Sequence, residues 1–170
     1  TGINMLGDIH GGAGEQCAEL FYEISSRIDN GATFEKAIQE ALREWESGNG
    51  KIISGFGHRF HKPIDPRAPR LLELVRLAAK ENIVSGKYAD IAEAIQSHLS
   101  IKKDIAMNID GATAVIFCEL GFPAPLSRGL FCLSRSVGIL SHAWEQIEQG
   151  GRNKGPMPPK YLPKYISKNT

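Results

Sequence analysis

Hydrophobic residues recur at intervals of three and four along most of this chain, the spacing that places side chains on one face of an α-helix. The pattern predicts six helices, the second of which ends in a glycine-rich stretch at 47–50. No segment has the alternation typical of a strand, and no internal repeat is present, so we expect an all-α protein. The predicted helices cover about residues 15–28, 34–46, 68–84, 88–101, 112–120 and 127–149.

Two of these helices carry more apolar surface than a small domain usually covers. The segment 112–120 is almost entirely apolar and is closed by Gly121-Phe122-Pro123, so we expect it to be buried. The last helix has an apolar stripe at helical spacing. Together they predict a homodimer. The stripe consists of Leu130, Leu133, Val137, Leu140, Trp144 and Ile147.

Composition narrows the class of protein. At 170 residues and 42% hydrophobic content, the chain can form one domain or two unequal lobes with a real core. A net charge of +1 argues against a nucleic-acid partner bound by bulk electrostatics. No apolar run is long enough to cross a bilayer, so no membrane partner is expected.

The cysteines and the first residues bear on cellular context. Cys17, Cys118 and Cys132 are dispersed, odd in number and without metal-site spacing. This usage fits the reducing cytoplasm better than a disulfide framework, and it gives no reason to expect a metal. Thr1 is neither an initiating methionine nor part of a signal peptide. We therefore expect the chain to begin partway through a longer protein.

One loop holds the densest group of chemically suggestive residues. Its two glycines permit close backbone approach and positive φ angles directly before His58, which can then face a ligand. Prolines on either side of Asp65 stiffen the return and fix the distance from His58 to Arg67. Lys62 and Arg67 are types that bind phosphate and carboxylate, although a solvated basic surface would look similar. The loop reads Gly55-Phe56-Gly57-His58-Arg59-Phe60-His61-Lys62-Pro63-Ile64-Asp65-Pro66-Arg67.

Four further polar residues lie at helix ends or within apolar runs. His10 stands among glycines before a helix, where backbone amides would favour a neutral imidazole able to donate to a carbonyl. Asp110 introduces the apolar segment 112–120, where a helix cap is the structural alternative. Arg135 interrupts the last helix and either extends to solvent or meets an anion. Arg152 follows two glycines, a place that equally suits a surface residue.

Taken together, these residues resemble the citrate synthase superfamily. That family has a histidine in a His-Gly-Gly-Ala segment, as in His10-Gly11-Gly12-Ala13, and another in Gly-x-Gly-His followed by Asp-Pro-Arg. This chain has Gly55-Phe56-Gly57-His58 and then Asp65-Pro66-Arg67. The family's aspartate before a helix matches Asn108-Ile109-Asp110-Gly111, and its Ser-Arg run matches Leu133-Ser134-Arg135-Ser136-Val137-Gly138. Because these motifs occur in the family's order and at similar spacing across nearly the whole chain, their combination is specific for this family.

The resemblance implies catalytic roles. Asp110 would take a proton from the methyl carbon of an acyl-coenzyme A thioester. His10 would donate to the thioester oxygen as the enol or enolate forms, and His58 would donate to the ketone of an oxo acid. The expected activity is formation or cleavage of a carbon–carbon bond, as in citrate synthase or citryl-CoA lyase. No metal is needed for it.

The resemblance also implies binding roles. Arg67 and Arg135 would hold the carboxylates of the oxo acid, and Arg152 would reach the site of a neighbouring subunit in a homodimer. Lys62 would contact a phosphate of coenzyme A. The backbone of Gly55, Phe56 and Gly57 would border the adenine.

The same likeness predicts a citrate synthase-like helical fold with two parts. Residues 12–111 would be the small domain, and residues 1–11 and 112–170 the C-terminal part of the large domain. Upstream large-domain helices of the family are not in this chain, so it could be inactive alone. Gly14-Glu15-Gln16 replaces the usual Asn-Glu, which leaves synthase, alkylcitrate synthase and lyase all open.

Two other classes of function also stay open. One is a non-catalytic module that binds coenzyme A or carboxylates, and the other is a helical scaffold in which the glycine loops only turn corners. Coenzyme A binding would exclude the scaffold.

Overall fold

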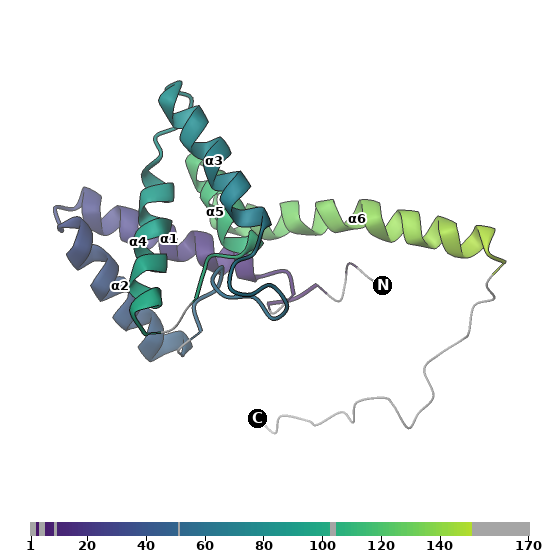
Figure 1. Ribbon diagram of the computed structural model, residues 1–170, viewed down its shortest axis with the longest axis horizontal. Helices are drawn as coiled ribbons and strands as arrows, with labels where there is room; N and C mark the ends of the chain where they lie inside the picture. Colours follow the sequence, from purple (N-terminus) through teal and green to yellow (C-terminus); the bar gives the residue numbers. More distant parts are fainter. Residues whose placement is uncertain (1–2, 4–5, 9, 51, 103–104, 151–170) are drawn as a thin grey trace, which may run out of the picture. The chain divides into compact units, whose positions relative to one another are not determined.

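The computed structural model describes residues 3, 6–8, 10–50, 52–102 and 105–150, and Arg152 lies outside them. The described residues form helices and one isolated bridge between Phe56 and Met107, which confirms the all-α prediction (Figure 1). None of these helices combines the length and apolar character needed to cross a membrane. The helices are α1 (Ala13–Asp29), α2 (Phe34–Asn49), α3 (Arg67–Lys80), α4 (Lys87–Lys102), α5 (Ile109–Glu119) and α6 (Ala124–Glu148).

Helix α5 is the centre of the core. It packs against α1, α3 and α4, and Figure 1 shows α3 and α5 side by side. Small side chains allow this close approach, since Ala112 and Ala114 are fully buried, while Phe21 and Ile24 of α1 fill the remaining space. Burial of a side chain such as Phe21 contributes about 1.5–3 kcal/mol. The predicted burial of 112–120 is therefore confirmed in part: Ala112, Ala114, Val115 and Cys118 are buried, whereas Leu120 is 53% exposed.

The apolar periodicity predicted some helix ends correctly and others wrongly. Thr33 caps α2 directly before the predicted start at residue 34, because its hydroxyl accepts a hydrogen bond from the Lys36 amide. Helix α3 ends at Lys80 and not near 84, so the prediction there was wrong. Asn82 adopts a left-handed φ of 58°, and the Ile83 amide donates back to the Ala78 carbonyl at 2.9 Å. That turn closes the helix although the apolar pattern continues.

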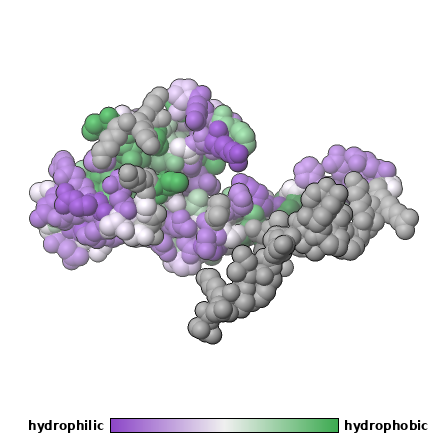
Figure 2. Space-filling model, turned by 90° about the horizontal axis from the view of Figure 1, so that it is seen from below, coloured by the Kyte–Doolittle hydropathy of each residue, from purple (hydrophilic) through white to green (hydrophobic). Residues whose placement is uncertain are grey.

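The chain divides into two units, residues 1–136 and 137–170. All residues of the site described below belong to the first unit. The face of the molecule in Figure 2 is mainly hydrophilic with separate hydrophobic patches. Large apolar side chains that are more than half exposed in α6 include Leu133, Val137, Leu140, Trp144 and Ile147. The predicted division at residues 12 and 111 stays a prediction.

Candidate active site

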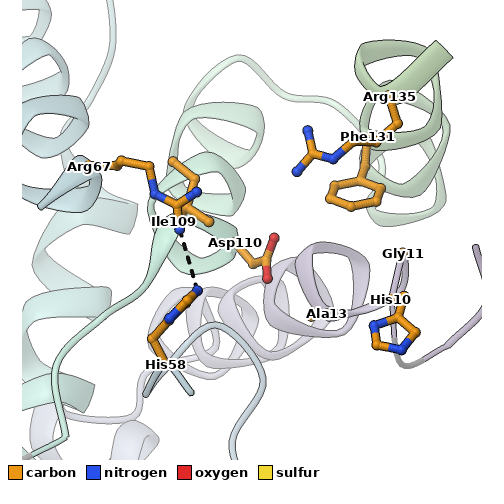
Figure 3. Close-up of a pocket in the computed structure, with 9 residues that line it drawn as sticks. All are labelled: His10, Gly11, Ala13, His58, Arg67, Ile109, Asp110, Phe131 and Arg135. Carbon is orange, nitrogen blue, oxygen red and sulfur yellow. Dashed lines mark hydrogen bonds between the residues drawn. The ribbon is translucent and has the colours of Figure 1, made fainter. Parts of the chain in front are cut away.

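A cavity of about 230 Å³ collects five of the predicted site residues. Residues from four segments line it: the loop before α1, the loop that leads into α3, the start of α5 and the middle of α6. In Figure 3 the Asp110 carboxylate lies between the pair Arg67 and His58 on one side and His10 and Arg135 on the other. The predicted residues in its lining are His10, His58, Arg67, Asp110 and Arg135.

The loop that carries His58 is held against the start of α5 by glycine contacts. Gly55 and Gly57 have φ angles of +89° and +78°, as predicted from their type. A Cβ atom on Gly55 would lie 2.5 Å from the sulfur of Cys17 and 2.9 Å from the Cα of Gly111. The Gly55 carbonyl accepts from the Asn108 amide at 3.0 Å, and the Gly57 amide donates to Ala106 at 2.7 Å. These contacts set the position of His58 relative to α5.

Backbone amides fix the tautomer of His58. Its Nδ1 accepts hydrogen bonds from the amides of Phe60 at 3.1 Å and His61 at 3.0 Å. A nitrogen that accepts two bonds carries no proton, so the proton of the neutral ring sits on Nε2. Nε2 lies 3.5 Å from Nη2 of Arg67 (Figure 3). Two donors, Nε2–H and the guanidinium, therefore meet at this wall of the cavity.

Arg67 is held by a buried carboxylate. Asp65 accepts hydrogen bonds from the Arg67 side chain at Nε (2.9 Å) and Nη2 (2.8 Å), and also from the Ile109 amide at 3.0 Å. Hydrogen bonds from Arg67 hold the pKa of Asp65 far below its usual range, so it is ionised. Asp65 thus links α3 to α5, and its fork geometry orients the guanidinium toward His58.

Asp110 lies in the first turn of α5 but does not cap it. The cap is Asn108, whose side-chain oxygen accepts from the amides of Asp110 and Gly111. Within the described residues, the Asp110 carboxylate accepts no hydrogen bond, and it lines the cavity. Burial raises its pKa, and the positive charges of Arg135 and Arg67 oppose that rise. A carboxylate with a raised pKa is suited to accept a proton near neutral pH.

Arg135 approaches the cavity from α6 together with an aromatic residue that sequence reasoning missed. Its guanidinium carbon lies 4.2 Å from the ring centroid of Phe131, one helical turn earlier. This stacking limits the directions in which Arg135 can point. Phe131 also lines the cavity. The only available signal was its i−4 spacing from a candidate arginine, which an ordinary core residue would share.

His10 is exposed and lies in the loop three residues before α1 begins. The loop is tight, since the Gly11 amide donates to the Gly7 carbonyl at 2.8 Å. Helix α1 has no side-chain cap at Gly12. The structure therefore brings His10 to the cavity from a loop that other residues must hold.

The residues predicted to bind coenzyme A lie beside the cavity or beneath it. Lys62 and Gly57 line a neighbouring cavity of about 330 Å³, which shares His58 with the first. Gly55 and Phe56 are buried and serve packing, with Phe56 paired to Met107. Their predicted contact with adenine stays a prediction, as do the ligand roles of all site residues. Arg152 lies outside the described residues.

The cysteines do not contribute a nucleophile to this cavity. Cys17 and Cys118 are buried in the core, and burial raises the pKa of Cys118 to about 12. Among the described residues, no three His, Cys, Asp or Glu side chains are grouped to hold a metal ion.

The two guanidinium groups of the lining indicate a ligand class. Arg67 and Arg135 line the cavity with Asp110, and the charge of Arg67 is balanced by the ionised Asp65 that binds it. Two guanidinium groups suit a ligand with more than one carboxylate. The cavity can thus hold a small polyanion while Asp110 accepts a proton and imidazole groups donate hydrogen bonds.

Comparison with known proteins places this arrangement in a family. The family described as citrate synthase, C-terminal domain, matches residues 3–157. A citrate synthase from Saccharolobus solfataricus is 33% identical over an alignment of 154 residues, which covers 87% of this chain and 38% of that protein. The chain thus spans well under half the length of this relative.

Two solved structures share the fold. A citryl-CoA lyase from Hydrogenobacter thermophilus has a TM-score of 0.69 and 28% identity, over 95% of this chain and 64% of that one. Citrate synthase from Thermoplasma acidophilum, in complex with carboxymethyl coenzyme A and oxaloacetate, has a TM-score of 0.66 and 28% identity, over 98% and 42%. With the family match running over most of its length, the chain belongs to the citrate synthase family and corresponds to its C-terminal domain.

Proposed function

We propose that this chain supplies the reacting groups of an enzyme that forms or cleaves the carbon–carbon bond of a citryl-type thioester. One observation carries the proposal: the Asp110 carboxylate faces a cavity together with two imidazoles and two guanidinium groups. The relatives named citrate synthase and citryl-CoA lyase share that bond-forming or bond-breaking step.

In the direction of synthesis, Asp110 takes a proton from the methyl carbon of an acyl-coenzyme A. His10 donates a hydrogen bond to the thioester oxygen, where negative charge develops, a role worth about 10²–10³ in rate. The enolate carbon then attacks the ketone of an oxo acid, His58 donates a hydrogen bond from Nε2–H to the oxygen that becomes the alkoxide, and this alkoxide takes up a proton from solvent. The reverse steps cleave citryl-coenzyme A into the same two molecules.

The arginines hold the carboxylates and the adjoining cavity holds the thioester carrier. Arg67 and Arg135 bind the oxo acid, a role supported by the two guanidinium groups in the lining of the cavity. Lys62 and Gly57, which line the neighbouring cavity, bind coenzyme A there, and the backbone of Gly55 and Phe56 borders the adenine from beneath. Because a relative was solved with carboxymethyl coenzyme A and oxaloacetate, acetyl-coenzyme A and oxaloacetate, or citryl-coenzyme A, are the first ligands to test.

The proposal includes a cytoplasmic homodimer in which Arg152 serves the neighbouring subunit. The exposed apolar residues of α6 support an apolar partner surface, whereas α5, which also suggested dimerisation from sequence, is covered within the chain. Sedimentation of the full-length protein as a dimer is expected, and a monodisperse monomer would contradict it.

The deciding experiment follows the acyl methyl group. In D₂O, the full-length protein should exchange the methyl protons of acetyl-coenzyme A and should convert citryl-coenzyme A, with products identified by NMR. Acetyl-coenzyme A and oxaloacetate as products indicate a lyase, and citrate indicates a synthase. Coenzyme A binding by calorimetry without exchange or turnover would favour the non-catalytic binding module, and no binding would favour a scaffold.

A further inference from the structure

Arg128 of α6 makes a two-carboxylate contact beside the cavity that the proposed chemistry does not use. Its Nε pairs with Glu15 in the first turn of α1, and its Nη2 lies 2.8 Å from Asp8 in the preceding loop. His10 lies between these two carboxylates in sequence. The arginine therefore holds both ends of the segment that carries His10.

The two contacts differ in strength. The Glu15 side chain is only 15% exposed, whereas that of Asp8 is 78% exposed. Exposed ion pairs contribute little, so the pair with Glu15 is the dominant one. Gly12 completes the contact: a Cβ there would lie 2.9 Å from Nη2 of Arg128 and 2.7 Å from the Asp8 carbonyl. The loop, the helix start and the arginine are thus packed together with no space for a side chain.

A second side chain connects the same loop to the loop of His58. Nε2 of Gln16 donates to the Asp8 carbonyl at 3.4 Å, and its Oε1 accepts from the Ser54 hydroxyl at 2.6 Å. Ser54 lies four residues before His58. Side chains from α1 and α6 therefore fix the loops that carry both imidazoles.

Helix geometry ties Arg128 to the cavity from the other side. Residues seven apart on a helix lie on one face, so Arg128 and Arg135 project from the same side of α6, with Phe131 between them. The contacts of Arg128 hold Glu15 and Asp8 against that face of α6. They therefore also set the position of His10 relative to Arg135 across the cavity.

We infer that Arg128 is a positioning residue that acts on the reaction through His10. This inference rests on the proposed function. Misplacement of a catalytic group by about 1 Å can cost roughly 10²-fold in rate. Arg128→Gln should therefore slow methyl-proton exchange roughly 10- to 100-fold and leave coenzyme A affinity unchanged. Arg128→Lys should restore part of the rate, and Glu15→Gln should cost more than Asp8→Asn.

The control is Arg27→Gln. Arg27 also pairs with several carboxylates, Glu23, Glu44 and Glu40, but near the far end of α1, about 18 Å along the helix from Glu15. The Arg27→Gln variant should leave methyl-proton exchange unchanged. A double-mutant cycle then separates positioning from folding: in a His10→Ala background, Arg128→Gln should cause no further loss. A further loss of the same size there, or an equal loss in Arg27→Gln, would overturn the inference.

A second measurement does not depend on activity. Arg128→Gln should speed hydrogen exchange of the Gly11 amide, which donates to Gly7, and Arg27→Gln should not; NMR follows both. Absence of methyl exchange in the unmodified protein would refute the proposed function. Unchanged protection of Gly11 in Arg128→Gln would refute the positioning role.

Discussion

The side chain of Asn108 accepts a hydrogen bond from the amide of Asp110 at 2.9 Å. By capping α5, Asn108 satisfies the backbone donors that the Asp110 carboxylate would otherwise bind. The carboxylate is left half-buried at the cavity, near Arg67 and Arg135 but without a hydrogen bond from the described residues. The helix start thus keeps a carboxylate available for proton transfer at a cost in stability.

Replacing Asp110 tests both parts of that arrangement. Asp110→Asn should lower methyl-proton exchange about 10²- to 10⁴-fold, the usual contribution of a general base, with coenzyme A affinity nearly unchanged. Mass spectrometry of recovered acetyl-coenzyme A measures the exchange. Exchange at the unmodified rate would remove Asp110 from the mechanism.

The same variant should be more stable at pH 7. Burial raises the pKa of Asp110 in the folded state, so above its unfolded value of about 3.9 ionisation costs stability, and the neutral amide avoids that cost. Asp29→Asn is the control with the opposite sign, because a hydrogen bond from Lys87 lowers the pKa of Asp29. Urea unfolding of both variants at pH 7 measures the two changes in stability. An Asp110→Asn variant less stable than the unmodified protein would contradict the argument.

Asp65 should confer stability that acid removes. Its pKa is depressed by folding, mainly through hydrogen bonds from Arg67. The stabilisation is therefore complete above the unfolded value of about 3.9 and declines as pH falls below it. Asp65→Asn should cost about 1.5–3 kcal/mol at pH 7, with a smaller difference at pH 3. A difference that is equal at the two pH values, measured by urea unfolding, would exclude this origin.

Gly111→Ala should destabilise the protein although Ala is the better helix former. A Cβ on Gly111 would lie 2.3 Å from the Gly55 carbonyl oxygen and 2.7 Å from Met107. Overpacking of this kind costs about 1–3 kcal/mol. Gly138→Ala, also within a helix but with no atom near the new Cβ, should instead gain up to about 1 kcal/mol. Thermal unfolding compares them, and a stabilised Gly111→Ala would show that the His58 loop is not packed against α5.

The sequence was sufficient for features that depend on local spacing. Apolar periodicity located the six helices of the described part of the chain, and the motif pattern selected five residues that one cavity brings together. It could not choose the cap of α5, because Asn108 and Asp110 are equally good cap types. It also could not reveal the pair of Arg128 and Glu15, which are 113 residues apart and meet only after α1 and α6 are packed.

Arg67→Lys distinguishes carboxylate binding from support of the loop. Arg67 uses Nε and Nη2 on Asp65, while Nη1 makes no hydrogen bond within the described residues. Lysine keeps the charge but cannot bind Asp65 with a planar fork and also reach a ligand. One charge-assisted hydrogen bond is worth about 1.5–3 kcal/mol, so affinity for the oxo acid should fall roughly ten- to a hundred-fold.

Acyl-coenzyme A affinity should barely change in the same variant, because Lys62 and the loop backbone are proposed to hold that ligand. Calorimetric titrations of both ligands into Arg67→Lys and Asp65→Asn make the comparison. Loss of the oxo acid alone in Arg67→Lys means that the guanidinium contacts its carboxylate. An equal loss for both ligands, matched by Asp65→Asn, would mean that Arg67 acts through Asp65 to support the whole loop, and the proposed carboxylate contact would then be wrong.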